Sequence, residues 1–187
     1  MRSISESVSG VSSTENYNLP KYGIAKLGKI KGFIPKQFIP AIKARRMSRF
    51  SQFAHASAVE AVKDSGININ GSNFNIGIAV GTGLASTDST DKFYEGLLRE
   101  GAEGTNPMIF PETVQNIAAS HISIHFSIRG PNITFSHSDI SSELALFYGC
   151  ELLKDKQADA VIVTGADELS LSLPSTEGHT DTGLLRR

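Results

Sequence analysis

The stretch Gly130–Leu153, "GPNITFSHSDISSELALFYGCELL", decides the fold of this chain. A Gly-Pro-Asn turn leads into a short β-favouring run, which then passes into a long, mostly apolar helical segment. Sharp turns between a strand and a helix are places where several enzyme families hold a nucleophile. This turn carries Ser136, His137, Ser138 and Asp139, but no cysteine. The turn is either an active site, a site that has lost its chemistry, or a capped helix.

Composition places the chain among ordinary globular proteins. It has 187 residues, 40% of them hydrophobic, and a formal net charge of -1. This balance gives no electrostatic reason to expect nucleic acid or an anionic membrane as a partner. No apolar run approaches the ~18 residues needed to span a bilayer. The first residues, "MRSISESVSGVSS", lack the apolar core of a signal peptide, so we expect a cytoplasmic protein.

Cys150 is the single cysteine of the chain, so no disulfide can form within it. It lies inside the apolar helical pattern that follows the quoted turn. Free cysteine is among the most buried residue types. We therefore expect Cys150 to be a buried packing residue.

Apolar periodicity divides the rest of the chain into alternating helices and strands. A helix is expected to start near Met47 or Ser48, with Gly66 placed to end it. The further expected elements are a buried strand at 76–80, an exposed helix at 88–100, a helix at 111–126, the quoted strand and helix, and a buried strand at 160–164. This alternation predicts an α/β fold with a central sheet covered by helices.

The two ends of the chain have little periodicity. Residues 1–29 are rich in Ser, Gly and Lys and are expected to form a loose arm. Residues 174–187 form a polar, turn-rich tail. The predicted domain therefore covers residues 30–173.

Two motifs that could indicate a cofactor or a metal are incomplete. "GTGLAS", residues 81–86, has serine in place of the third glycine of a dinucleotide-binding loop, and no acidic residue follows at the required distance. His121 and His125 share one helix face, but residue 122 is isoleucine rather than the glutamate of a metalloprotease motif. We therefore expect no cofactor and no metal, and interpret the glycines as a turn where the chain leaves the sheet.

Ser136, His137 and Asp139 are the residue types of a hydrolase triad. They are nearly contiguous, however, and a working triad usually draws its members from distant segments. Asp139 also has a structural explanation, because a carboxylate at a helix start accepts backbone N–H bonds and gains from the helix dipole. Ser138 could serve as the cap instead.

Several segments, in order, resemble one enzyme family. They are "ARRMSRFSQFAHASAVEAVKDSG", "IGIAVGTGL", "NPMIFPETVQNIAASHISIHFSIRGPNITFS" and "ADAVIVTGADE". Together they resemble the N-terminal half of β-ketoacyl-acyl-carrier-protein synthases and of the related chain-length factors. The resemblance runs from about Phe38 to Glu168. It implies a thiolase-like fold with a mixed central sheet, in which two similar α/β halves stack into five layers and two subunits pair.

The resemblance also assigns a role to the quoted turn. The family pattern Thr-Ala-Cys-Ala-Ser matches "HSDIS", so that His137, Ser138 and Ser141 belong to the turn and Asp139 replaces the nucleophilic cysteine. A carboxylate keeps the negative charge at the helix start but is a poor acceptor for a thioester's acyl group. Chain-length factors also lack the cysteine, although they usually carry glutamine there. The C-terminal half, which holds the family's catalytic histidines, is missing, and His121, His125 and His179 do not match them.

The resemblance therefore implies a ketosynthase-like, non-condensing subunit of fatty-acid or polyketide biosynthesis. Its expected partners are acyl-carrier protein or a ketosynthase subunit, in a homodimer or heterodimer. Two alternatives stay open. The chain is a truncated inactive remnant, or it is half of a split synthase that another chain completes.

Overall fold

The computed structural model describes residues 6–13, 26–69 and 74–169. The described residues divide between two compact units, one before and one after the boundary at Ile34 and Pro35. In the first unit, β1 (Val11–Ser13) pairs antiparallel with β2 (Lys26–Gly28). These two strands lie within the segment expected to be a loose arm. The second unit holds the other elements and is described separately.

The centre of the second unit is a sheet of three strands, in the order β4–β3–β5. β3 (Ile76–Gly81) is buried along its whole length and pairs with β4 (Asn132–Phe135) on one edge and β5 (Ala160–Gly165) on the other. Both pairings are parallel, as the long helical crossovers between the strands require. The α/β fold is as expected, and the part of the sheet that the structure describes is parallel rather than mixed.

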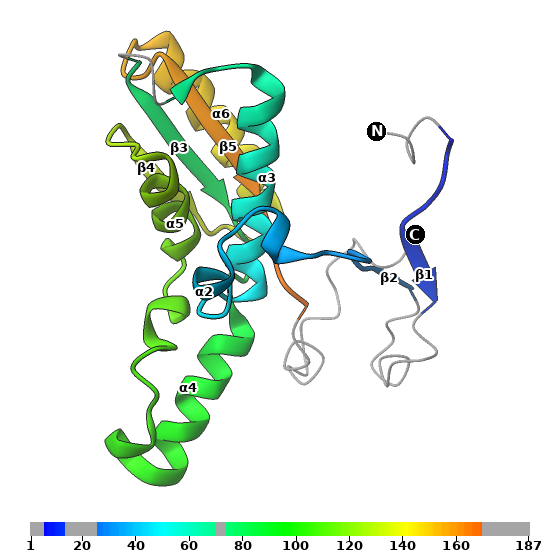
Figure 1. The fold of residues 1–187 in the computed structure, drawn as a ribbon, viewed down its shortest axis with the longest axis vertical. Coiled ribbons are helices and arrows are strands. Elements are labelled where there is room, and N and C mark those ends of the chain that lie inside the picture. Colours follow the sequence, from blue (N-terminus) through cyan, green and yellow to red (C-terminus); the bar gives the residue numbers. More distant parts are fainter. Residues whose placement is uncertain (1–5, 14–25, 70–73, 170–187) are drawn as a thin grey trace. The chain divides into compact units, whose positions relative to one another are not determined.

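Helices cover both faces of this sheet (Figure 1). α3 (Arg49–Ser65) and α5 (Ile117–Phe126) pack together on one face, and α6 (Ser141–Lys154) packs on the other. The core between the sheet and the first pair of helices includes these buried side chains: Phe50, Ala54, Ala58, Ile76, Ile78, Val80, Ala118, Ala119, Ile122 and Ile162.

The ends of α3 lie where the sequence predicted them. Ser48 is the N-cap, and its hydroxyl accepts a hydrogen bond from the Ser51 N–H. Gly66 ends the helix in the left-handed conformation, with φ 70°, which glycine adopts without a steric penalty.

The predicted helix at 111–126 is shorter in the structure. A 3₁₀ turn, η5 (Phe110–Thr113), is followed by Val114 in extended conformation, and α5 begins only at Ile117. The break has a tertiary cause. Glu112 is 4% exposed and its carboxylate is directed to the start of α3, where it accepts hydrogen bonds from Ser48 and Ser51.

The remaining elements of the second unit are short or peripheral. η2 (Pro35–Gln37) and α2 (Ala41–Ala44) precede α3, and α4 (Thr87–Glu100) follows β3 and continues into η4 (Gly101–Gly104). α4 extends away from the sheet (Figure 1). Every helix in the described part of the chain is too short or too polar to cross a membrane.

The prediction that Cys150 is buried is wrong, because its side chain is exposed. α6 buries Ser141, Ala145, Gly149 and Leu152 against the sheet, and Cys150 lies on the opposite side of the helix. Apolar residues occur on both sides of α6. The sequence pattern therefore indicated burial without revealing that the described residues cover only one side of the helix.

Candidate functional site

The strand-to-helix turn of the quoted stretch, residues 136–141, is called the elbow below. The elbow leads from β4 through a 3₁₀ turn, η6 (Ser138–Ile140), into α6. Ser138 has a φ of 53°, in the left-handed region that a serine adopts rarely. The Ser141 hydroxyl spans the turn: it accepts a hydrogen bond from the His137 N–H at 2.8 Å and donates one to the Ser138 carbonyl at 2.7 Å. Ser141 is 2% exposed, so this bridge is shielded from water.

The prediction that Asp139 or Ser138 caps the helix is wrong. α6 begins after Ile140, and that position has no side-chain cap hydrogen bond. Asp139 lies in the middle of η6, is exposed, and has no hydrogen-bonded or ionic partner among the described residues. The intervening 3₁₀ turn moves its carboxylate away from the first N–H groups of α6. The carboxylate is therefore free to meet another molecule.

Three glycines allow the elbow to approach the sheet closely. A Cβ at Gly81 would lie 2.5 Å from the Ser141 carbonyl oxygen, and one at Gly83 would lie 3.3 Å from the Ser138 carbonyl oxygen. A Cβ at Gly165 would collide with the Ser142 side chain. The glycines of "GTGLAS" thus have a role beyond the turn predicted from the sequence. They leave room for the backbone of the elbow and for the first turn of α6.

Asp167, directly after β5, fixes the loop that follows β3. Its carboxylate accepts hydrogen bonds from the Thr82 hydroxyl and from the backbone N–H groups of Gly83, Leu84 and Ala85, at 2.7–3.1 Å. The same carboxylate lies 3.4 Å from the position that a Gly83 Cβ would take. Asp167 therefore orients the loop whose Gly83 lies against the Ser138 carbonyl.

Glu168 connects two helix starts in the same region. It is 6% exposed and accepts hydrogen bonds from the Phe50 N–H at the start of α3 and from the Asp88 N–H and Ser86 hydroxyl at the start of α4. Sequence reasoning did not single out Asp167 or Glu168. The available signal was an acidic pair directly after a buried strand, where parallel strands bring loops together.

The histidines of the sequence analysis lie elsewhere. His121 and His125 belong to α5, on the opposite face of the sheet from α6. His121 pairs with Glu112 at 2.7 Å, and His125 contacts His55 edge to face, with ring centroids 4.6 Å apart. The described residues contain no group of histidine, cysteine or acidic side chains that could hold a metal. His179 and the predicted tail at 174–187 lie outside the described residues.

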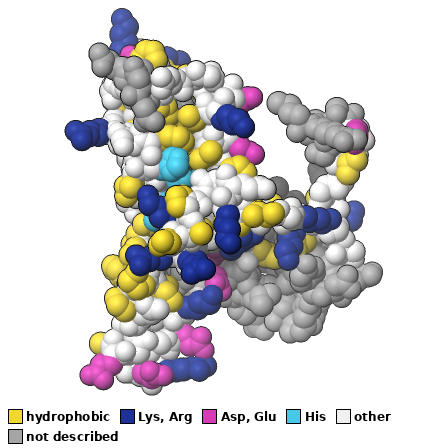
Figure 2. Space-filling model, viewed as in Figure 1, with side chains coloured by type: hydrophobic (Ala, Val, Ile, Leu, Met, Phe, Trp, Pro, Cys, Tyr) yellow, Lys and Arg dark blue, Asp and Glu magenta, His cyan; other side chains and the backbone are white. Residues whose placement is uncertain are grey.

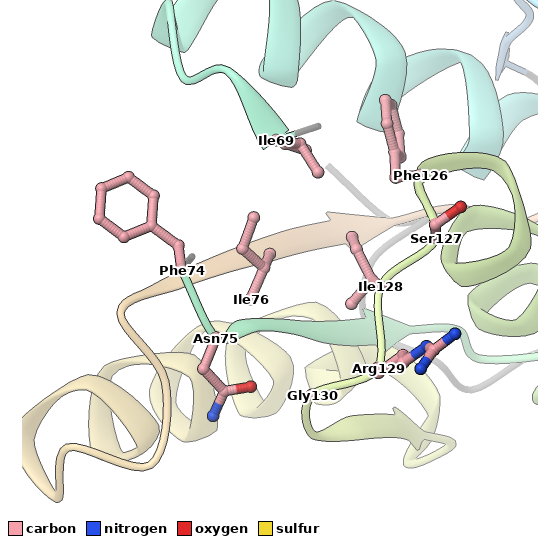
Figure 3. Close-up of a pocket in the computed structure, with 9 residues that line it drawn as sticks. All are labelled: Ile69, Phe74, Asn75, Ile76, Phe126, Ser127, Ile128, Arg129 and Gly130. Carbon is pink, nitrogen blue, oxygen red and sulfur yellow. The ribbon is translucent and has the colours of Figure 1, made fainter. Parts of the chain in front are cut away.

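A hollow in the surface lies at the other end of the sheet, where β3 begins (Figure 3). It is lined by Ile69, Phe74, Asn75, Ile76, Phe126, Ser127, Ile128, Arg129 and Gly130. None of the predicted site residues borders it. The candidate site is therefore the exposed elbow at the carboxyl ends of the strands, which is where ligands bind in open α/β sheets.

The family model of the β-ketoacyl synthase N-terminal domain matches residues 8–185. The chain belongs to the β-ketoacyl synthase family. The match is wider than the resemblance seen in the sequence, which began near Phe38. A 3-oxoacyl-[acyl-carrier-protein] synthase 2 of Vibrio cholerae is 28% identical over 88% of this chain, and one of Coxiella burnetii is 27% identical over 88%.

Solved structures agree with this β-ketoacyl synthase fold. A type II polyketide ketosynthase in complex with its acyl-carrier protein matches with a TM-score of 0.74 at 20% identity, over 79% of this chain and 42% of that one. The ishigamide ketosynthase/chain length factor matches with a TM-score of 0.72 at 20% identity, over 90% and 48%. At 20% sequence identity, these two matches show a similarity of fold alone.

This β-ketoacyl synthase chain spans about 40% of the length of the curated relatives just named. The thiolase-like fold expected from the sequence is therefore present as one half. The other half of the relatives has no counterpart in the residues described here.

Proposed function

We propose that this chain is a non-condensing ketosynthase-like subunit, of the chain-length-factor type, in fatty-acid or polyketide biosynthesis. The observation that carries the proposal is the elbow. Close packing against glycines and the Ser141 bridge hold the turn that carries Asp139, the residue matched to the family's nucleophilic cysteine.

The chemistry of a carboxylate at this position supports a role without condensation. A cysteine thiolate attacks an acyl thioester, expels the carrier thiol and forms a new thioester of similar reactivity. The same attack by the Asp139 carboxylate would form a mixed anhydride, which is more reactive than the thioester that it replaces. The acyl group would return to the carrier thiol or pass to water. Asp139 therefore keeps a negative charge at the elbow but does not store the acyl chain.

The test is acyl transfer to the intact protein, followed by mass spectrometry of the whole chain. Wild-type protein incubated with acyl-CoA or acyl-carrier protein is expected to gain no acyl mass. Asp139→Cys is the matched comparison, because it restores the thiol of the family pattern on the same backbone. An acyl group found on Asp139 in the wild-type protein would contradict the proposal.

A carrier protein or a ketosynthase subunit is the proposed partner. One structural neighbour is a ketosynthase in complex with acyl-carrier protein, and another is a ketosynthase in complex with its chain length factor. A surface suited to an anionic partner lies around α2, where Lys and Arg side chains gather (Figure 2). Lys43, Arg45 and Arg46, the basic cluster, are exposed and have no carboxylate partner among the described residues. Acidic residues are absent from the segment 35–49.

A second candidate function is one half of a split synthase that another chain completes. The uncovered apolar side of α6 favours it. Co-expression with a chain that carries the remaining half, followed by a condensation assay, tests this candidate. Loss of activity on Asp139→Ala would assign a catalytic contribution to this chain, whereas unchanged activity would assign it a scaffold role.

A further inference from the structure

Gln52, at the end of the first turn of α3, reaches back to the segment that joins α2 to α3. Its side chain is 8% exposed, and both polar groups of its amide have hydrogen-bond partners within the protein. The Nε2 atom donates to the Ala44 carbonyl at 2.8 Å and to the Met47 carbonyl at 3.0 Å. An amide nitrogen carries two hydrogens, so these two bonds use its full donor capacity. Gln52 therefore ties together the two ends of the segment 44–47.

Arg45 and Arg46 lie between the two carbonyls that Gln52 holds. Ala44 and Met47 are buried, at 8% and 7% exposure, in a small apolar cluster that precedes α3. The two arginines between them are exposed. The buried ends and the Gln52 hydrogen bonds therefore fix the backbone of this segment while leaving both guanidinium groups at the surface.

The oxygen of the same amide holds a third arginine. The Arg49 Nη1 atom donates to the Gln52 Oε1 atom at 3.1 Å, and the Arg49 guanidinium carbon lies 4.7 Å from the centre of the Phe53 ring. A guanidinium group stacks favourably on an aromatic face, so this ring holds Arg49 from a second side. Arg45, Arg46 and Arg49, here called the arginine surface, are all exposed. One buried amide thus holds all three, two through the backbone and one through its side chain.

We propose that Gln52 is a positioning residue, which fixes the arginine surface in one arrangement for an anionic protein partner. The segment 35–59 holds five basic residues and no acidic residue, so its charge suits such a partner. Ordering a loose segment on binding costs conformational entropy, and a surface that is already fixed in the free protein avoids much of that cost. The proposal rests on the carrier-protein partner proposed above, and it adds a buried residue on which that contact depends.

The first test is hydrogen–deuterium exchange of the free protein. Gln52→Met keeps the length of the side chain but removes its two N–H donors and its carbonyl oxygen. The backbone amides of residues 45–47 are expected to exchange about tenfold faster or more in this variant, because the segment opens locally more often. Thr164→Val is the matched control, since the buried Thr164 bonds to Ser57 of α3 rather than to the segment 44–47. Unchanged exchange at residues 45–47 in Gln52→Met, or an equal increase in both variants, would overturn the proposal.

The second test is the binding of acyl-carrier protein, measured by surface plasmon resonance. Gln52→Met is expected to weaken binding about three- to tenfold, the size expected when a few side chains lose their preorganisation. The loss is expected as faster dissociation, with the association rate within about twofold of the wild type, because the charge of the surface is unchanged. Thr164→Val is expected to bind as the wild type does. Equal weakening by Thr164→Val would assign the loss to lowered stability and would overturn the proposal.

The third test asks whether Gln52 acts through the arginines. In the double variant Arg45→Gln, Arg46→Gln, the further change Gln52→Met is expected to weaken carrier-protein binding less than it does in the wild type, because two of the positioned groups are gone. Equal weakening in the two backgrounds would overturn the proposal. Wild-type protein that binds no carrier protein would instead overturn the proposed partner, and the exchange test, which uses no carrier protein, would still decide whether Gln52 fixes the segment.

Discussion

His55, in the middle of α3, is 3% exposed, and neither of its ring nitrogens has a hydrogen-bond partner among the described residues. Burial, together with the nearby His125, His121 and Lys43, lowers the pKa of His55 from 6.5 to about 4. The side chain is therefore neutral at physiological pH and packs against His125 as an aromatic ring. Protonation would place an unpaired charge between α3 and α5.

We predict that the free energy of unfolding decreases as the pH is lowered from about 6.5 to about 4, because of His55. In the unfolded chain the imidazole takes up a proton near pH 6.5, whereas in the folded chain it does so only near pH 4. The unfolded state therefore binds more protons in this window, which corresponds to a loss of roughly 3 kcal/mol at most. His55→Leu should flatten the dependence in urea unfolding at several pH values. His137→Gln, which changes an exposed histidine, should leave the pH dependence as it is in the wild type. An unchanged pH dependence in His55→Leu would contradict its assignment to His55.

Gly81 is predicted to tolerate no side chain. A Cβ there would lie 2.5–2.6 Å from backbone atoms of Ser141 and Ser142, which cannot move without displacing the start of α6. Gly81→Ala is expected to lower the unfolding free energy by about 1–3 kcal/mol, as overpacking does. Gly10→Ala is the control, because nothing lies within 4 Å of a Cβ at that position. Equal thermal melting of the two variants would show that the elbow is not tightly packed.

At the scale of the element, Glu112 shows how a loop residue stabilises a helix from outside. Its carboxylate accepts hydrogen bonds from the Ser48 N–H, from the Ser48 and Ser51 hydroxyls, and pairs with His121. Burial alone would raise the pKa of Glu112, but the hydrogen bonds from His121, Ser51 and Ser48 outweigh it and lower the pKa below its usual value. The start of α3 thus depends on a residue 64 positions away.

We predict that Glu112→Gln destabilises the protein by about 2 kcal/mol or more, because it removes hydrogen bonds to a buried charge. The depressed pKa of Glu112 means that its contribution is present at neutral pH and is lost as the pH falls below the usual range of a glutamate. Denaturant unfolding at pH 7 measures the loss. Glu151→Gln, at an exposed pair with Lys154, should cost less than about 0.5 kcal/mol. Similar losses for the two variants would contradict this role of Glu112.

At the scale of the whole molecule, the basic cluster provides a test of the proposed carrier-protein partner. The double variant Arg45→Glu, Arg46→Glu is expected to weaken binding of acyl-carrier protein about tenfold or more, because it replaces attraction by repulsion at a contact surface. Calorimetric titration at low and high salt measures the change, which should shrink as salt screens it. Lys63→Glu, at an exposed lysine near the end of α3, is the control. Equal weakening by Lys63→Glu would place the carrier protein elsewhere.

Local signals predicted the elements whose causes are local. Ser48 and Gly66 mark the two ends of α3 in the structure, as the sequence predicted. Capping could be predicted because it depends on residues close to one another in the chain. The helix predicted at 111–126 was wrong in its first part because Glu112 turns inward to reach Ser48. The role of Asp167 was not predicted from the sequence, because the four groups that donate hydrogen bonds to it lie more than 80 residues away in the chain.

The sequence by itself determined the α/β alternation and the family resemblance, and it carries the prediction that Asp139 stands at the position of the family's cysteine. Each of these depends on residue type and order, which folding does not change. Only the tertiary structure decided that Asp139 stands exposed in a 3₁₀ turn rather than capping α6, and that Cys150 faces outward. The physical reason is that periodicity reports how apolar a helix side is, whereas burial requires a second surface to cover it. In the described chain, the sheet covers one side of α6 and leaves the other exposed.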